Sequence, residues 1–138
     1  MRIAVVDGQG GGIGKNIISR LRQDLGPDLE ILALGTNATA TLAMIRAGAN
    51  DGATGENAIC RNAPLVDVIT GTISIICAHS MLGEVTPAMA EAVASCRARK
   101  LLLPLTRLEV EVMGVVPEPM PHYVDMLIAR LKILLRGG

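Results

Sequence analysis

The stretch MRIAVVDGQGGGIGKNIISRL, residues 1–21, decides the fold. Its apolar run at residues 3–6 is short, continuous and aliphatic, which predicts a fully buried strand. Five glycines follow within residues 8–14, and apolar residues then recur with helical spacing until Gly26 ends the pattern. The chain is therefore expected to open with a strand, a glycine-rich turn and an amphipathic helix.

The rest of the chain repeats this alternation of apolar runs and amphipathic segments. Further strands are predicted at residues 29–34, near 57–61, at 66–71 and at 101–103, and further helices at about 37–48, 86–99 and 122–136. Residues 108–112 alternate strictly between apolar and acidic side chains, as an edge strand does. We expect one compact Rossmann-like α/β domain over residues 1–138. Its doubly wound, mostly parallel sheet has five or six strands, with an antiparallel edge strand near the C-terminus.

Composition excludes several classes of partner. Thirteen basic and 13 acidic residues give a formal charge of zero, and Tyr123 is the one aromatic residue, so a nucleic-acid partner is not expected. The three cysteines have no metal-type spacing to each other or to the two histidines, so no metal site is expected. The most apolar stretch, residues 66–82, is too short to span a membrane and carries Asp67. We expect a cytoplasmic protein without a membrane partner.

The glycine-rich turn predicts a phosphate site. Amides in the first turn of a helix lack partners, and glycine lets a phosphate approach without a Cβ in the way. The leading hypothesis is that the loop binds a small phosphate-bearing ligand, either a dinucleotide such as NAD(P) or a mononucleotide. The predicted binding residues are Gly8, Gln9, Gly10, Gly11, Gly12, Ile13, Gly14 and Lys15, with Thr36 and Asn37 at the end of the second strand.

Two other functions stay open. In the first, the protein is a non-catalytic structural or interaction protein whose glycines merely make a tight turn. In the second, it is a small nucleotide-hydrolysing switch, although Asn16 stands where such loops carry the hydroxyl that holds magnesium. Whether the protein is an enzyme is left open.

Four residues are catalytic candidates. Asp7 follows the first strand directly and is either a reactive carboxylate or a cap for the loop amides. His79, Ser80 and Glu84 follow the strand at 66–71, near the expected switch point of the sheet, and suit acid–base chemistry. The alternative is that Glu84 only favours the start of the next helix. The polar loop at residues 50–57 either covers a ligand or simply connects two elements.

Two families carry glycine loops similar to this one. Gly8-x-x-x-Gly12-Ile13-Gly14 resembles the fingerprint of the short-chain dehydrogenase/reductase family, and residues 10–16 resemble the phosphate loop of the partition-type ATPases. Both resemblances end with the loop. No Tyr-x-x-x-Lys pair follows for the former, since Leu127 stands four residues after Tyr123, and the latter's signature lysine falls on Gly10.

Over nearly its full length the chain resembles a family of short bacterial proteins grouped as a domain of unknown function. The resemblance is carried by VDGQGGGIGK at residues 6–15, GANDGATGENAI at 48–59 and SMLGEVTPAMAEA at 80–92. It implies no reaction.

The last predicted helix is apolar on more than one side. Its apolar residues spread beyond a single stripe, and a helix of this kind is usually buried on more than one side. In so small a protein the additional apolar surface predicts a homodimer contact.

Overall fold

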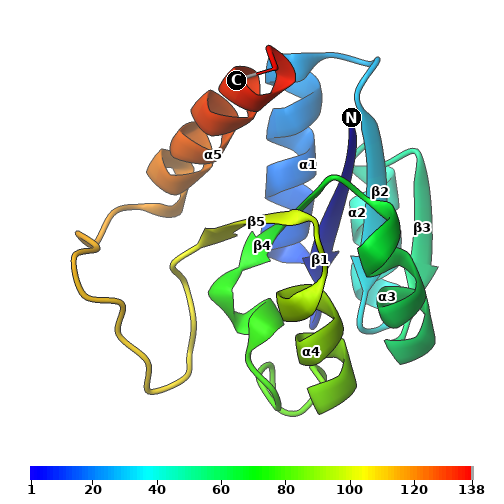
Figure 1. The fold of residues 1–138 in the computed structure, drawn as a ribbon, viewed down its shortest axis with the longest axis vertical. Helices are drawn as coiled ribbons and strands as arrows, with labels where there is room; N and C mark the ends of the chain where they lie inside the picture. The colour runs from blue at the N-terminus through cyan, green and yellow to red at the C-terminus, as the bar shows by residue number, and fades with distance from the viewer. Residues whose placement is uncertain (138) are drawn as a thin grey trace.

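The structure, a computed structural model, describes residues 1–137. It is an alternation of strands and helices around one sheet (Figure 1). In chain order the elements are β1 (Arg2–Asp7), α1 (Gly12–Leu25), β2 (Glu30–Gly35), α2 (Ala38–Arg46), β3 (Asp51–Thr54), α3 (Glu56–Asn62), β4 (Val68–Thr72), α4 (Pro87–Ser95), β5 (Arg99–Leu103) and α5 (Met120–Leu135), with short 3₁₀ turns at Ala63–Leu65 and Ile73–Ile76.

The sheet has five strands in the order β3-β2-β1-β4-β5, and every neighbouring pair is parallel. β1 lies at the centre and pairs with β2 from Arg2–Glu30 to Asp7–Gly35. After β1 the chain builds outward through β2 and β3, and it then returns to place β4 on the other side of β1. The order of the strands therefore reverses between β1 and β4, and Asp7 ends the strand at that point.

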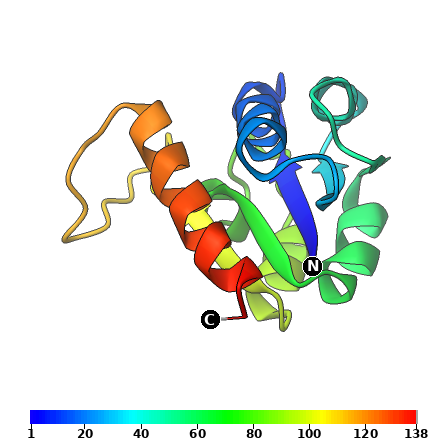
Figure 2. The same cartoon turned by 90° about the horizontal axis from the view of Figure 1, so that it is seen from above.

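Helices cover both faces of the sheet. Side chains from α1, α2 and α5 pack on one face around Ile3, Val5 and Ile31, and side chains from α3 and α4 pack on the other around Ala4 and Leu32. Neighbouring residues of β1 thus enter different cores, as the alternation of side chains along a strand requires. Figure 2 shows α5 lying across the sheet beside β4 and β5.

Local sequence explains where the helices begin and end. The Asn37 side chain accepts a hydrogen bond from the amide of Ala40 at 2.9 Å, and Thr86 caps α4 through the amide of Met89 at 3.2 Å. Both are residue types that favour this position. Gly26 ends α1 with a φ of 86°, a conformation that suits glycine.

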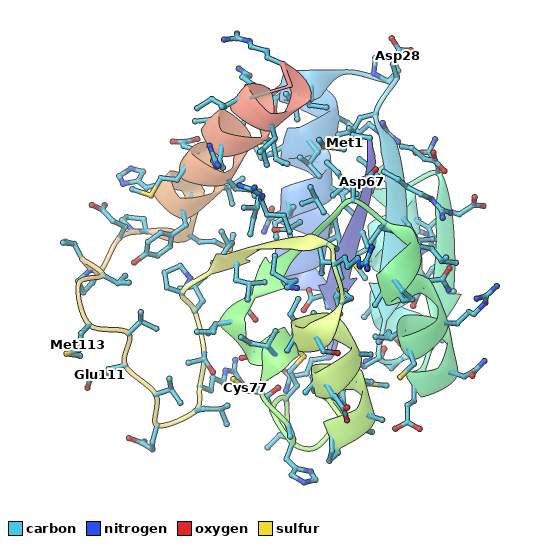
Figure 3. The ribbon with its side chains drawn as sticks, viewed as in Figure 1. Met1, Asp28, Asp67, Cys77, Glu111 and Met113 are labelled. Carbon is cyan, nitrogen blue, oxygen red and sulfur yellow. The ribbon has the colours of Figure 1, made fainter. Side chains whose placement is uncertain are left out.

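The structure corrects two predicted strands. Residues 57–61 lie in α3, and the strand is β3, which comes directly before that helix. Residues 108–112 form no strand, so the predicted antiparallel edge strand is not present within the described residues. The segment from 104 to 119 instead leaves the end of β5 and projects from the sheet before α5 begins (Figures 1 and 2). Figure 3 shows Glu111 and Met113 on this projecting segment.

Candidate functional site

Three glycines of the loop are required by packing. A Cβ on Gly8 would clash with the Thr36 hydroxyl and lie 2.7 Å from the sulfur of Met81. Gly11 has a φ of 73°, and a Cβ there would lie 2.9 Å from the backbone of Ala40. A Cβ on Gly14 would lie 2.5 Å from the sulfur of Met44. These contacts hold the strand, the loop and α1 close together.

The other two glycines have no such role. A Cβ on Gly10 or Gly12 would meet no atom within 4 Å, and neither residue has a left-handed φ. Both are exposed. The amides of Gly10, Gly12 and Ile13 donate to no other group within residues 1–137, whereas the neighbouring loop amides all have acceptors. The loop and the start of α1 therefore keep three free donors, at Gly10, Gly12 and Ile13.

Asp7 caps the loop from below. One carboxylate oxygen accepts from the amide of Gly8 at 2.8 Å, and the other accepts from the amide of Gly14 at 2.7 Å. The side chain is 6% exposed and forms no ion pair with a described residue. Burial raises the pKa of Asp7, the charge of Glu84 adds to this effect, and the two amides oppose it. The arrangement is the one that the capping interpretation predicts.

Glu84 joins three segments that are distant in the sequence. Its Oε1 accepts from the amide of Gln9 at 2.8 Å, from the Thr36 hydroxyl at 2.7 Å and from the Asn37 side-chain amide at 2.8 Å. Burial raises the pKa of Glu84, but these three hydrogen bonds together outweigh burial and lower it. Thr36 and Asn37, predicted as ligand contacts, thus direct their donors to a protein carboxylate. We call Glu84 and its three donors the Glu84 clamp.

The segment before Glu84 has an unusual backbone. His79, Met81 and Leu82 have φ values of 67°, 56° and 55°, a region that residues with a side chain seldom adopt. Leu82 at its tip is 96% exposed. Ser80 is 1% exposed, and its hydroxyl donates to the carbonyl of Ser74 at 2.5 Å, so this serine holds the turn together.

A cavity of about 550 Å³ lies where the strand order reverses. In parallel α/β sheets, ligands bind beyond the carboxyl ends of the strands at this position. Its walls come from the ends of β1 and β4, the start of α1 and the segment after β5. The turn at residues 79–83, which has the unusual φ values, completes them. They consist of Asp7, Gln9, Ile13, Thr72, Ser74, His79, Met81, Leu82, Leu105, Thr106, Arg107 and Leu108.

The structure therefore brings together part of the predicted set. Asp7, Gln9, Ile13 and His79 line the cavity, whereas Lys15 is exposed on α1 and does not. Gly10 and Gly12 lie in the same loop but outside the cavity lining. The polar loop expected at residues 50–57 is instead β3 and the start of α3.

Sequence reasoning missed the contributions of β4 and β5. Thr72 and Ser74 follow the predicted strand at 66–71, and their position at its carboxyl end is the signal that could have identified them. Leu108 was missed because 108–112 was assigned to an edge strand, and no motif in the sequence marked Thr106 or Arg107 as part of a site. Arg107 is exposed and forms no ion pair with a described residue.

Two further properties of the described residues bear on the site. Within residues 1–137, no group of three or more histidine, cysteine, aspartate or glutamate side chains is arranged to hold a metal ion. In the same part of the chain, no helix combines the length and the apolar character needed to cross a membrane.

Comparison with known proteins identifies a family. No curated protein and no solved structure matches the chain. The family described as "Domain of unknown function (DUF3842)" matches residues 2–136, a range that includes the glycine loop, the Glu84 clamp and every residue of the cavity wall. The resemblance to a domain of unknown function is thereby confirmed, and the chain belongs to the DUF3842 family.

Proposed function

We propose that the protein binds a small phosphate-bearing ligand, a nucleotide, at the start of α1. The observation that carries the proposal is the presence of Gly10 and Gly12, which packing does not require. Glycines that leave open space beside free helix-start amides are what a phosphate needs for close approach. The cavity beside the loop supplies room for the rest of the ligand.

The charges around the loop are mixed. The dipole of α1 and the three free amides favour an anion, and Lys15 is exposed one turn into the helix. Asp7 opposes an anion while it is ionised. Because burial raises the pKa of Asp7, its carboxylate takes up a proton more readily than an exposed aspartate does.

The fold favours the same proposal. The strand order β3-β2-β1-β4-β5 is that of a Rossmann-like, doubly wound domain, in which a glycine loop follows β1 and ligands sit between β1 and β4. A cytoplasmic location, where nucleotides are abundant, belongs to the proposal. The proposal is limited to binding, since the Ser80 hydroxyl is buried and Glu84 is held by three donors.

The first alternative is a structural or interaction protein whose glycines only make a tight turn. It explains why glycine is needed at Gly8, Gly11 and Gly14, but it does not explain the glycines at positions 10 and 12. The hydrolysing switch is disfavoured by Asn16, whose side chain has no hydroxyl for a metal-bound nucleotide. A magnesium-dependent response would favour the switch over simple binding.

The test is a thermal-shift panel followed by calorimetry. The panel contains NAD, NADP, ATP, ADP, AMP and FMN, each with and without magnesium. A ligand at 100 times its Kd adds about 2.7 kcal/mol, which raises the melting temperature of a domain this size by about 10 °C. A flat response to every compound would favour the structural alternative.

Calorimetry with the best compound then locates the site. Gly12→Val puts a branched side chain into the open space at the helix start and should weaken binding strongly. Ser19→Val, at an exposed position on the same helix, controls for the effect of a β-branched residue on α1. Lys15→Ala should weaken binding less, and Lys132→Ala, on the exposed side of α5, should not weaken it. If wild type and Gly12→Val bound the compound with equal affinity, the binding site would lie away from the glycine loop.

A further inference from the structure

The two sides of the glycine loop differ sharply. On the β2 side, the Glu84 clamp fills the space between the loop and the end of β2. Thr36 donates its one proton to Glu84, and Asn37 donates its two protons to Glu84 and to the carbonyl of Gln9, at 3.0 Å. No donor of these two side chains remains for a ligand.

This closed side is where a dinucleotide would place its adenosine half. In dinucleotide-binding α/β folds, a group at the end of the second strand holds the adenosine ribose, and the pyrophosphate crosses the glycine loop. Here a ligand in that position would have to displace Glu84 and break three hydrogen bonds to a carboxylate. If Glu84 stayed in place, its charge would repel the pyrophosphate.

The β4 side is open. The cavity of about 550 Å³ lies there, within the size range of pockets that hold one small ligand. Its walls combine apolar side chains, such as Ile13 and Leu105, with the hydroxyl-bearing Thr72 and Ser74. Arg107 is the one lysine or arginine among the residues of the wall.

Asp7 adds unused hydrogen-bond acceptor capacity to the wall of this cavity. It is a buried carboxylate in the cavity wall, and no cation of the described chain pairs with it. Buried charges are normally paired or fully hydrogen-bonded. Each oxygen of Asp7 accepts one hydrogen bond and has capacity for another, which a ligand hydroxyl or N–H group can fill.

We propose that the site binds a mononucleotide on the β4 side and that the Glu84 clamp excludes dinucleotides. The inference rests on the proposed function of the loop. The phosphate takes the free amides of Gly10, Gly12 and Ile13, and Arg107 supplies the positive charge that offsets Asp7. The sugar hydroxyls face Asp7, Thr72 at the end of β4 and Ser74 in the 3₁₀ turn that follows. The base or ring lies against the apolar wall. Arg107 and Glu84 thus determine specificity.

The test compares mononucleotides with dinucleotides by isothermal calorimetry on the intact chain. The probes are AMP, GMP, UMP and FMN against NAD and FAD. The best mononucleotide is expected to bind at least about tenfold more tightly than either dinucleotide, because a dinucleotide must break charge-assisted hydrogen bonds of the clamp. Arg107→Ala should weaken mononucleotide binding about tenfold. Arg130→Ala, at an exposed position of α5 outside the cavity, should leave it unchanged.

The clamp is tested by a variant that keeps its shape. Glu84→Gln retains an acceptor oxygen and removes the charge, so it should narrow the gap between NAD and the best mononucleotide. Wild type could instead bind NAD or FAD more tightly than AMP and FMN, with Gly12→Val abolishing that binding. This result would refute the exclusion of dinucleotides by the Glu84 clamp, while the phosphate site at the loop would still be supported. Absence of binding by every probe would overturn the phosphate site and this inference with it.

Discussion

Packing requires glycine at position 14 of the loop but not at position 12, so replacement by alanine should have opposite effects on stability at these two positions. Gly14→Ala adds a methyl group 2.5 Å from the sulfur of Met44 and 3.0 Å from the Cβ of Asp7, in a region where Met44 is completely buried. Overpacking of this kind costs about 1 to 3 kcal/mol. Gly12→Ala adds a methyl group in open space at a position without a left-handed φ. It should be neutral or should stabilise by up to about 1 kcal/mol, because alanine loses less backbone freedom than glycine on folding.

Urea denaturation of both variants measures the difference. We expect the free energy of unfolding to separate Gly12→Ala from Gly14→Ala by about 1 to 4 kcal/mol, with unchanged m-values. Gly10→Ala, also in open space, should behave like Gly12→Ala. If Gly12→Ala were as destabilising as Gly14→Ala, packing would require Gly12 after all. The argument that its absent side chain serves a ligand would then fail.

Three further predictions follow from the same contacts. Asn37→Ala removes the cap of α2 and one donor of the Glu84 clamp, so it should lower the free energy of unfolding by about 1 to 2 kcal/mol in urea denaturation. Thr39→Ala, at an exposed position of the same helix, should lower it much less. Equal losses of stability in the two variants would contradict the capping role of Asn37. Because the pKa of Glu84 is lowered by folding, its stabilisation is complete above the ordinary pKa of a glutamate and is lost as pH falls through the folded value. Wild type should therefore lose more stability than Glu84→Gln between about pH 6 and about pH 3, and parallel curves would refute this. The predicted homodimer contact lies on α5, where Met126 is 62% exposed; light scattering should give a dimer mass that Met126→Lys reduces, and a monomer mass at high concentration would refute the contact.

Much of the fold could be predicted because its signals are local. Continuous aliphatic runs mark β1 and β2, since strands buried on both faces favour apolar side chains at successive positions. Asn37 and Thr86 cap helices as their residue types favour. The parallel arrangement follows from the alternation of these strands with helices.

The two wrong strands show where local signals fail. β3 has the sequence DGAT, which carries almost no apolar signal, because it is an edge strand held by backbone pairing with β2. Residues 108–112 alternate as a strand does, but no neighbouring strand pairs with them in the described chain. A period of two describes the side chains and does not supply a hydrogen-bonding partner.

The candidate site was predictable where it followed a strand and unpredictable where it depended on tertiary contacts. Asp7 and the glycines come directly after β1, so their place at the edge of the sheet follows from the strand itself. The bonds of Glu84 to Gln9 and Asn37 join residues 75 and 47 positions apart, and no local pattern encodes such a pairing.

The Glu84 clamp also makes one backbone amide a reporter of local motion. The amide of Gln9 belongs to no helix or strand, and its acceptor is the side chain of Glu84. Its exchange with deuterated solvent therefore measures how often the hydrogen bond between Gln9 and Glu84 opens, independently of global unfolding. The amide of Ile3, inside the central strand, should exchange far more slowly. Slower exchange at Gln9 after a ligand is added would show that the ligand stabilises this hydrogen bond.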